Sequence, residues 1–164
     1  MLNALKTHLP TYQITSITTQ NFPQAYEIYQ SNQAFFQLVQ GADTTPEKSI
    51  QDITALPPHC TPDQKLYIRI SQNSQPLAVL DIIEKFPTPD CFWIGLLLVH
   101  RQHQGSNIGS QITQAILSAA KTAGYKKAQL GVVDSNKKGV HFWQKLGFIK
   151  TGQSDDVIIM ARDI

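Results

Sequence analysis

The chain has 164 residues, of which 41% are hydrophobic and 16% charged, and its formal net charge is +2. This length suits one domain over residues 1–164 with a single core, and the hydrophobic fraction excludes a largely disordered chain. The small net charge gives no support for a nucleic-acid partner, and no apolar run approaches the ~20 residues of a membrane span.

The charge is unevenly divided along the chain. Residues 1–100 carry 5 Lys/Arg and 8 Asp/Glu, whereas residues 101–164 carry 9 Lys/Arg and 4 Asp/Glu. This division suits a site that holds a polyanion at one end and a cation at the other. Chance variation in a small protein is the alternative interpretation.

The two cysteines and the N-terminal residues bear on the cellular compartment. Cys60 and Cys91 are 31 positions apart, without metal-ligand spacing, so we expect two free thiols and no metal site. The N-terminus lacks the apolar run of a signal peptide. We therefore expect a cytoplasmic protein.

The first third of the chain predicts one strand and two helices. Alternating apolar residues indicate a strand over 12–19. Helical spacing then indicates a helix over 22–29, capped by Asn21. Residues 31–46 are interpreted as a polar connection, and a second helix follows near 47–55.

The middle of the chain predicts three strands. Residues 66–70 alternate, and residues 77–85 form a second strand that pairs with the first as a hairpin. Residues 91–99 are apolar on both faces, as in a central strand. Within it, Gly95 indicates a bulge or a close backbone approach. Cys91 is expected to lie in the core.

The last third predicts the clearest helix and completes the sheet. Apolar residues at helical spacing begin at Ile108, and Gly124 is placed to end that helix. Further elements are a strand over 126–133, a helix over 135–146 capped by Ser135, and strands over 148–151 and 157–160. The resulting order predicts an α+β domain around one mixed sheet.

The connection between the strand 91–99 and the helix after it favours an anion site. Gly105 and Gly109 let the backbone approach a phosphate, and the free amides of the helix start point toward it. The spacing fits neither a P-loop nor a dinucleotide-binding fingerprint. An ordinary glycine-containing turn is the alternative.

Two segments carry a family resemblance. Residues 104–109 (QGSNIG) resemble the Gln/Arg-x-x-Gly-x-Gly/Ala signature of the GCN5-related N-acetyltransferases, the GNAT superfamily. Residues 136–148 (NKKGVHFWQKLGF) are similar to the Asn-x-x-Ala-x-x-Phe-Tyr-x-x-x-Gly-Phe segment of the same family. The two segments have the family's order and separation, and the resemblance extends over residues 12–162.

The resemblance implies a fold and a reaction. The fold is a three-layer α/β/α domain, whose mixed and mostly antiparallel sheet is splayed at strands 4 and 5. The reaction is transfer of acetyl from acetyl-CoA to a primary amine of a small molecule or protein, by direct attack without a covalent enzyme intermediate. The implied acetyl-CoA-binding residues are Leu97, Leu98, Val99, Gln104, Gly105, Ser106, Asn107, Ile108, Gly109, Ser110, Asn136, Phe142 and Trp143.

Several positions depart from the family pattern. Asn107 and Gly139 replace the usual glycine and alanine, and Asn tolerates left-handed angles. Trp143 replaces the tyrosine often credited with protonating the thiolate, and an indole is not a useful general acid. Trp93 occupies the position of the acidic base of some relatives.

These departures leave the catalytic groups open. Asp81 and Glu84 on the preceding strand are the candidate bases, and each could instead be a surface carboxylate. An acyl-CoA-binding protein without turnover, and a transferase for another acyl group or a hydroxyl acceptor, are the alternative functions. In this fold residues 31–46 cover the acceptor site, with Asp43 as a candidate ammonium partner. The oligomeric state stays open, with a homodimer as one alternative.

Overall fold

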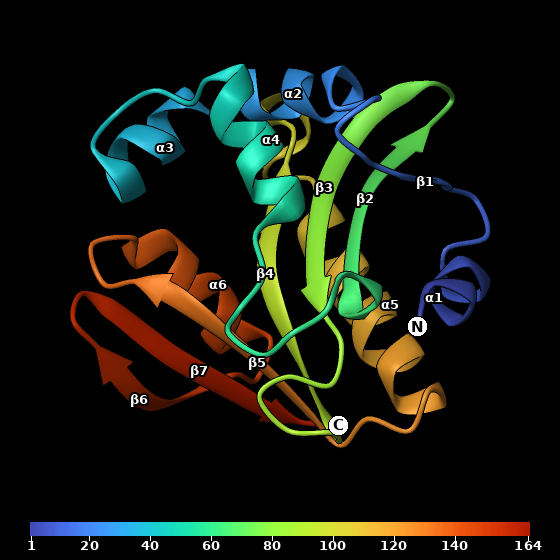
Figure 1. Ribbon diagram of the computed structural model, residues 1–164, viewed down its shortest axis with the longest axis vertical. Helices are drawn as coiled ribbons and strands as arrows, with labels where there is room; N and C mark the ends of the chain where they lie inside the picture. Colours follow the sequence, from blue (N-terminus) through green and yellow to red (C-terminus); the bar gives the residue numbers. More distant parts are fainter.

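A seven-stranded sheet forms the centre of the computed structural model, which describes residues 1–164 (Figure 1). The strand order is β1-β2-β3-β4-β5-β7-β6, and every neighbouring pair is antiparallel except β4 and β5. The strands are β1 (Gln13–Ser16), β2 (Lys65–Gln72), β3 (Gln75–Ile83), β4 (Cys91–Val99), β5 (Lys127–Val133), β6 (Ile149–Ser154) and β7 (Val157–Asp163). The predicted α+β class is confirmed.

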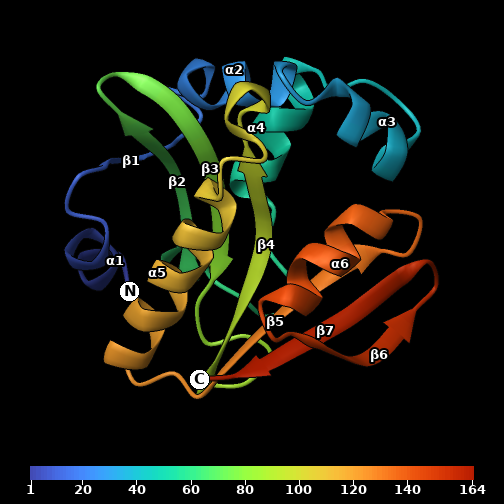
Figure 2. The same cartoon turned by 180° about the vertical axis from the view of Figure 1, so that it is seen from behind.

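Helices cover both faces of the sheet. They are α1 (Leu2–His8), α2 (Pro23–Gln30), α3 (Gln33–Gln40), α4 (Pro46–Thr54), α5 (Ile108–Thr122) and α6 (Lys137–Lys145). Figure 2 shows α1, α5 and α6 on one side, while α2, α3 and α4 gather at the other side. This arrangement confirms the predicted three layers. A membrane span would need a longer apolar helix than any in this fold.

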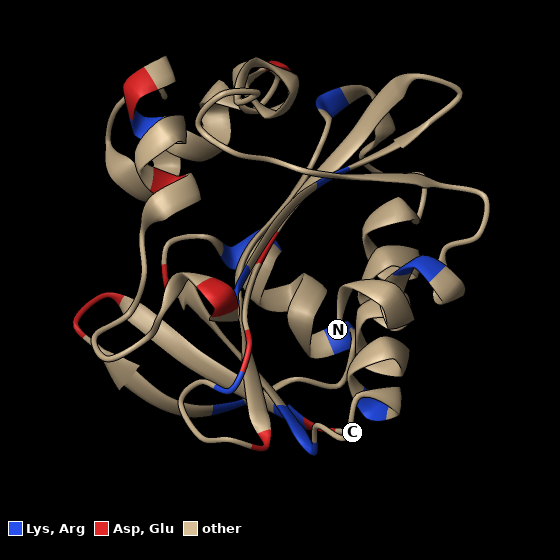
Figure 3. Ribbon diagram, turned by 45° about the vertical axis from the view of Figure 1, so that its right-hand side comes forward, with Lys and Arg blue, Asp and Glu red and all other residues tan.

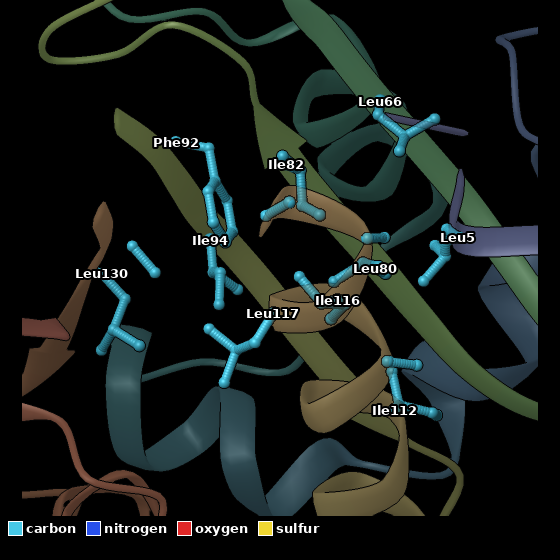
Figure 4. Close-up of a cluster of buried hydrophobic side chains, with 14 of the residues drawn as sticks. Leu5, Leu66, Leu80, Ile82, Phe92, Ile94, Ile112, Ile116, Leu117 and Leu130 are labelled. Carbon is cyan, nitrogen blue, oxygen red and sulfur yellow. The ribbon is translucent and has the colours of Figure 1, made fainter. Parts of the chain in front are cut away.

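The larger core lies between α5 and the sheet. It contains 23 buried residues, and Ile112 and Ile116 of α5 are fully buried against strand residues such as Leu80 and Ile94 (Figure 4). A smaller core of 9 buried residues lies under α2 and α4. The sheet is thus buried on both faces at its centre, as the doubly apolar pattern of residues 91–99 predicted.

Strand β4 shows why Gly95 is a glycine. Asp81 of β3 pairs with Leu96, while the next residue of β3 pairs with Ile94, so Gly95 is the extra residue of a bulge. A Cβ atom on Gly95 would lie 2.7 Å from Oδ2 of Asp81. The bulge and the close approach are therefore both present.

Several local predictions are wrong. Helix α1 was not predicted, and the connection assigned to residues 31–46 contains α3. Asn21 does not cap α2; its Oδ1 instead accepts a 2.6 Å hydrogen bond from the Thr18 N–H. Helix α6 is capped by Asn136, whose Oδ1 accepts a 3.0 Å hydrogen bond from the Gly139 N–H, and not by Ser135.

Strands β4 and β5 separate along their length. Their parallel pairing covers only the first four residues of each strand, Cys91–Ile94 against Lys127–Leu130. Beyond this point β4 stays paired with β3, and β5 stays paired with β7. The sheet is therefore splayed between these two strands, as predicted, and each carries an unpaired backbone edge there.

Replacing Ile116 with alanine tests the position of the core. Ile116 has no exposed surface, so the substitution should lower the free energy of unfolding by about 2–5 kcal/mol through lost burial and a residual cavity. Urea denaturation measures the change. The control is Ile149→Ala, because Ile149 is 68% exposed and its loss should cost no more than about 0.5 kcal/mol. Equal losses in both variants would contradict this description of the core.

Candidate functional site

A cavity of about 900 Å³ opens where β4 and β5 separate. Its walls come from the unpaired parts of these two strands, the loop after β4, and helices α3, α5 and α6. Eighteen of its 34 lining residues are hydrophobic. This volume lies at the upper end of the ~300–1,000 Å³ range of small-molecule sites.

One end of the cavity presents free backbone donors and cationic side chains. No backbone N–H of residues 105–110 donates a well-formed hydrogen bond to a protein atom, so a run of consecutive donors is free. Asn107 has the left-handed φ of 66°, which allows the chain to turn into α5 at this point. Arg101, His103 and Lys138 also line the cavity. Free amides, the helix dipole and cationic side chains together favour a phosphate group.

The middle of the cavity is the gap between the two separated strands. Gly95–Val99 line it from β4, and residues 130–133 line it from β5. Buried backbone groups normally require partners, so these unpaired strand edges can accept the amide groups of an extended ligand. Asn136 and the rings of Phe142 and Trp143 line the cavity from α6, with the two rings edge to face at 4.9 Å.

The structure brings most of the sequence-predicted residues together. Of the predicted acetyl-CoA-binding set, all but Ser106 line this cavity. The hydroxyl of Ser106 instead donates to the backbone carbonyl of His103 in the same loop. Gly139 also gains an explanation, because a Cβ atom there would lie 2.5 Å from Nδ2 of Asn136, the cap of its own helix.

Asp81 lies at the opposite end from the phosphate-binding surface. Its side chain lines the cavity, is 13% exposed, and lies 3.0 Å from Nζ of Lys65. Its Oδ1 is buried and has no hydrogen-bond partner. Burial raises the pKa of Asp81 to about 6, against the opposing effect of the Lys65 ammonium. A carboxylate with this pKa can exchange a proton at neutral pH.

The other candidate acidic position lies elsewhere. Glu84 is outside the cavity: its carboxylate accepts a 2.7 Å hydrogen bond from the Tyr125 hydroxyl and lies 3.6 Å from the N-terminal ammonium. Trp93 is also absent from the cavity wall, and its ring packs edge to face on Phe86 at 5.9 Å. Asp81 is therefore the one of the two candidate bases that reaches the cavity.

A polar cluster beside Asp81 was not predicted from the sequence. The hydroxyl of Tyr29 donates a 3.0 Å hydrogen bond to Oδ2 of Asp52 and also bonds the hydroxyl of Tyr67. Asp52 and Tyr67 line the cavity. Burial raises the pKa of Asp52 and of Tyr67. These residues lie on α2, α4 and β2, and no spacing in the sequence connects them.

Helix α3 covers the same end of the cavity. Its lining residues are Ala34, Phe35, Phe36, Leu38, Val39 and Gln40. These fall within residues 31–46, the segment expected to cover the acceptor. Asp43 does not line the cavity, because it accepts a 2.8 Å hydrogen bond from the side-chain amide of Gln37.

The charged lining residues differ between the two ends. Arg101 and Lys138 lie with the free amides, and Asp52 and Asp81 lie at the α3 and α4 end. Along the ribbon as a whole, acidic and basic segments are interspersed (Figure 3). The separation matches the uneven charge of residues 1–100 and 101–164.

Comparisons with known proteins agree with this geometry. A model of the acetyltransferase (GNAT) family matches residues 22–148. Among curated proteins, the L-amino acid N-acyltransferase MnaT of Escherichia coli (strain K12) is 30% identical over 59 residues. That match covers 36% of this chain and only 34% of the relative.

Solved structures share the fold across almost the whole chain. An acetyltransferase from Thermus thermophilus has a TM-score of 0.81 at 21% identity, covering 94% of this chain and 97% of the other. The ribosomal-protein-S18-alanine N-acetyltransferase of Escherichia coli gives 0.66 at 20% identity, covering 93% and 94%. The PaiA N-acetyltransferase of Thermoplasma acidophilum, solved in complex with coenzyme A, gives 0.67 at 12% identity, covering 93% and 99%.

Replacing Gly95 with alanine tests the contact between the bulge and Asp81. The added Cβ would lie 2.7 Å from Oδ2 of Asp81, so the carboxyl must move away from Lys65. We expect a loss of about 1–3 kcal/mol in the free energy of unfolding. The matched control is Gly152→Ala in β6, where the nearest atom would be 3.8 Å away. Equal stability of the two variants in urea denaturation would refute the close approach.

Proposed function

Because the chain belongs to the acetyltransferase (GNAT) family, we propose that it transfers an acetyl group from acetyl-CoA to a primary amine. The observation that carries this proposal is the run of free backbone amides at residues 105–110, at one end of a cavity between separated strands. The proposal treats residues 1–164 as one acyltransferase domain acting in the cytoplasm.

In the proposed complex, acetyl-CoA would lie in the cavity with its pyrophosphate at the glycine-containing loop and its thioester toward Gly95. The free amides of the loop and the start of α5 would bind the pyrophosphate, with Arg101 and Lys138 as further cationic groups nearby. The unpaired edge of β4 at 97–99 would pair with the pantetheine arm, except at the Val99 carbonyl, which already accepts hydrogen bonds from Asn32 and Gln104. The thioester then lies near the bulge at Gly95, which is where Asp81 approaches β4.

Asp81 is the proposed general base. An amine of pKa near that of lysine arrives protonated at neutral pH and must lose a proton before it can attack. Asp81, directly or through one water, first takes one proton from the ammonium. The free amine then attacks, the N–C bond forms and the C–S bond breaks, and the nitrogen gives its second proton to solvent as it becomes an amide. The departing CoA thiolate takes its proton from solvent, because Trp143 offers no acidic group.

Two parts of the proposal need a test of their own: the identity of the acceptor amine, and whether the protein turns over acetyl-CoA at all. The name of the curated relative makes an amino acid one acceptor to test. Trp93 and Trp143 favour a second candidate, a protein that binds acyl-CoA without turnover, since neither residue offers an acid or base. Release of free thiol from acetyl-CoA, measured over a panel of amines, separates the two functions.

Replacing Gly109 with glutamate tests the donor site. The new side chain would enter the cavity beside Phe142, whose ring would be 3.3 Å from the added Cβ, and would set a carboxylate against the pyrophosphate. We expect acetyl-CoA binding to fall below detection in calorimetric titration of the folded variant. The charge-matched control is Gln114→Glu on the exposed side of α5, which should bind normally. Normal affinity in the Gly109 variant would refute the assignment of this loop.

Replacing Asp81 with asparagine tests the base. We expect kcat to fall by about 10²–10⁴-fold while acetyl-CoA affinity is kept. Burial raises the pKa of Asp81 to about 6, and only the ionised carboxylate accepts a proton. In the unmodified protein, the slope of log kcat/KM against pH should therefore be steeper by about one unit below pH 6 than above it. The variant should lack this break. An unchanged pH profile in the variant would exclude Asp81 as the base.

A further inference from the structure

We infer that the acceptor is a primary ammonium carried on an apolar group, with no carboxylate next to the amine. The inference rests on the proposed function and specifies the acceptor class of the same site. It follows from the charges, the unpartnered atoms and the apolar wall of the cavity end that the acetyl donor does not use.

The donor and acceptor ends of the cavity have separate walls. The free amides, the loop after β4 and α6 form the donor end. The other end is formed by α3, by α4 and by the strands β2 and β3. The residues that α4 and the strands contribute are Asp52 in α4, Ala55 at its C-cap, Tyr67 on β2 and Asp81 on β3. The bulge at Gly95 lies between the two ends, because it lines the cavity and contacts Asp81. An amine that attacks a thioester at the bulge must therefore approach from the Asp52 and Asp81 side.

The acceptor end carries unbalanced negative charge. Asp52 and Asp81 both line it, and the charge of Asp52 contributes to the raised pKa of Asp81. Lys65 is the nearby cation, and its ammonium is 3.0 Å from Oδ2 of Asp81 and 2.7 Å from the carbonyl of Ala55. The Lys65 side chain is only 7% exposed and does not line the cavity. The charges of Lys65 and Lys48 both act on Asp52, against the burial that raises its pKa. Neither ammonium lines the cavity, so the charged groups of this part of the wall are carboxylates alone.

An unpartnered atom points to a donor group on the ligand. Oδ1 of Asp81 is buried without a hydrogen-bond partner, while Oδ2 binds Lys65 and lies beside the space that Gly95 leaves. The carboxyl group as a whole lines the cavity and is 13% exposed. A buried carboxylate oxygen without a partner is costly, and an ammonium supplies both the hydrogen bond and the opposite charge. The acceptor's amine is thus bound at the position from which it can attack.

The same end offers nothing for a carboxylate on the acceptor. The cations that line the cavity, Arg101 and Lys138, belong to the donor end. Two more cations lie near the acceptor end but outside the wall: Lys48 donates a 3.0 Å hydrogen bond to Gln40, and Arg69 lies further along β2. A carboxylate beside the amine would therefore face Asp52 and Asp81 with no cation of the wall to bind it, which is unfavourable in a partly buried site.

The remaining wall is apolar. Helix α3 contributes Phe35, Phe36, Leu38 and Val39 to the cavity. Leu38 is 49% exposed, one of only two large hydrophobic side chains with such exposure. Exposed apolar surface inside a cavity gains free energy when an apolar group of the ligand covers it. An arylalkylamine and a peptide N-terminus that begins with an apolar residue both present this chemistry.

Three compounds of matched shape test the inference. They are 2-phenylethylamine, L-phenylalaninamide and L-phenylalanine, which share the amine and the ring and differ in the group next to the amine. Each is titrated into the protein saturated with CoA, which prevents turnover, and each is assayed for thiol release with acetyl-CoA. Spermidine serves as a polar amine. We expect the first two compounds to bind at least about tenfold more tightly, and to have at least about tenfold higher kcat/KM, than phenylalanine or spermidine.

A pair of variants assigns the effect to the acidic wall. Asp52→Asn keeps the hydrogen bond from Tyr29 but removes a charge, so the ratio of phenylalaninamide to phenylalanine affinity should fall by about threefold or more. Asp43→Asn is the control, because Asp43 lies outside the cavity wall and its removal should leave the ratio unchanged. A change of equal size in both variants would overturn the role of Asp52.

The outcomes separate the inference from the proposed function. Phenylalanine or spermidine bound as well as phenylalaninamide would overturn the acceptor class, even if all are acetylated. Preferential binding of the apolar amines without thiol release would support the acceptor class and overturn the transferase. A preference for phenylalaninamide over phenylethylamine would support the class and identify a peptide N-terminus as its source, whereas the reverse preference would identify a small amine.

Discussion

The separation of β4 from β5 is the constraint on which the rest of the site depends. Two parallel strands that pair over only Cys91–Ile94 and Lys127–Leu130 leave backbone donors and acceptors without partners inside the fold. Such groups are costly to bury dry, so the gap must hold either water or a ligand with peptide-like groups. The cavity, its length and its direction all follow from this one interruption of the sheet. The two cores on either side of β4 keep the strand in place despite the missing neighbour.

The charges of the cavity follow the order of the chain. Elements before residue 100 build the end with Asp52 and Asp81, and elements after residue 100 build the end with the free amides, Arg101 and Lys138. In the proposed reaction this division would place a polyanionic donor and a cationic acceptor at opposite ends of one cavity, on either side of the bulge at Gly95. Part of the uneven charge of the sequence, carried by Asp52, Asp81, Arg101 and Lys138, thus lies in the cavity wall.

The sequence predicted the donor end far better than the acceptor end, for a physical reason. The donor end is local: β4, the glycine-containing loop and α5 are consecutive, so the apolar run, the glycines and the helical stripe were all visible in one segment. The bulge at Gly95 was also predicted, because a lone glycine weakens a buried strand unless a bulge or a close approach requires it.

The acceptor end depends on contacts between distant segments. Tyr29, Asp52 and Tyr67 come from three elements and meet only in the folded chain, so no spacing indicated them. Helix α3 was missed because its eight residues are flanked by polar segments that favour a loop. The two capping errors have different causes. Ser135 and Asn136 are adjacent polar residues that can each cap a helix, and the structure uses Asn136. Helix α2 starts after Phe22 without a side-chain cap, because the Asn21 side chain accepts from Thr18 instead.

The two ends are also joined mechanically, through the carbonyl of Val99 at the end of β4. This oxygen accepts a 3.1 Å hydrogen bond from Nδ2 of Asn32 and a 3.0 Å hydrogen bond from Nε2 of Gln104. The same Gln104 amide donates a 2.7 Å hydrogen bond to Oδ1 of Asn32. Asn32 is 3% exposed and precedes α3, while Gln104 opens the phosphate-binding loop. Because the residue before α3 and the glycine-containing loop share these hydrogen bonds, the position of one constrains the position of the other. Such a link would preorganise the cavity for the two substrates of the proposed reaction.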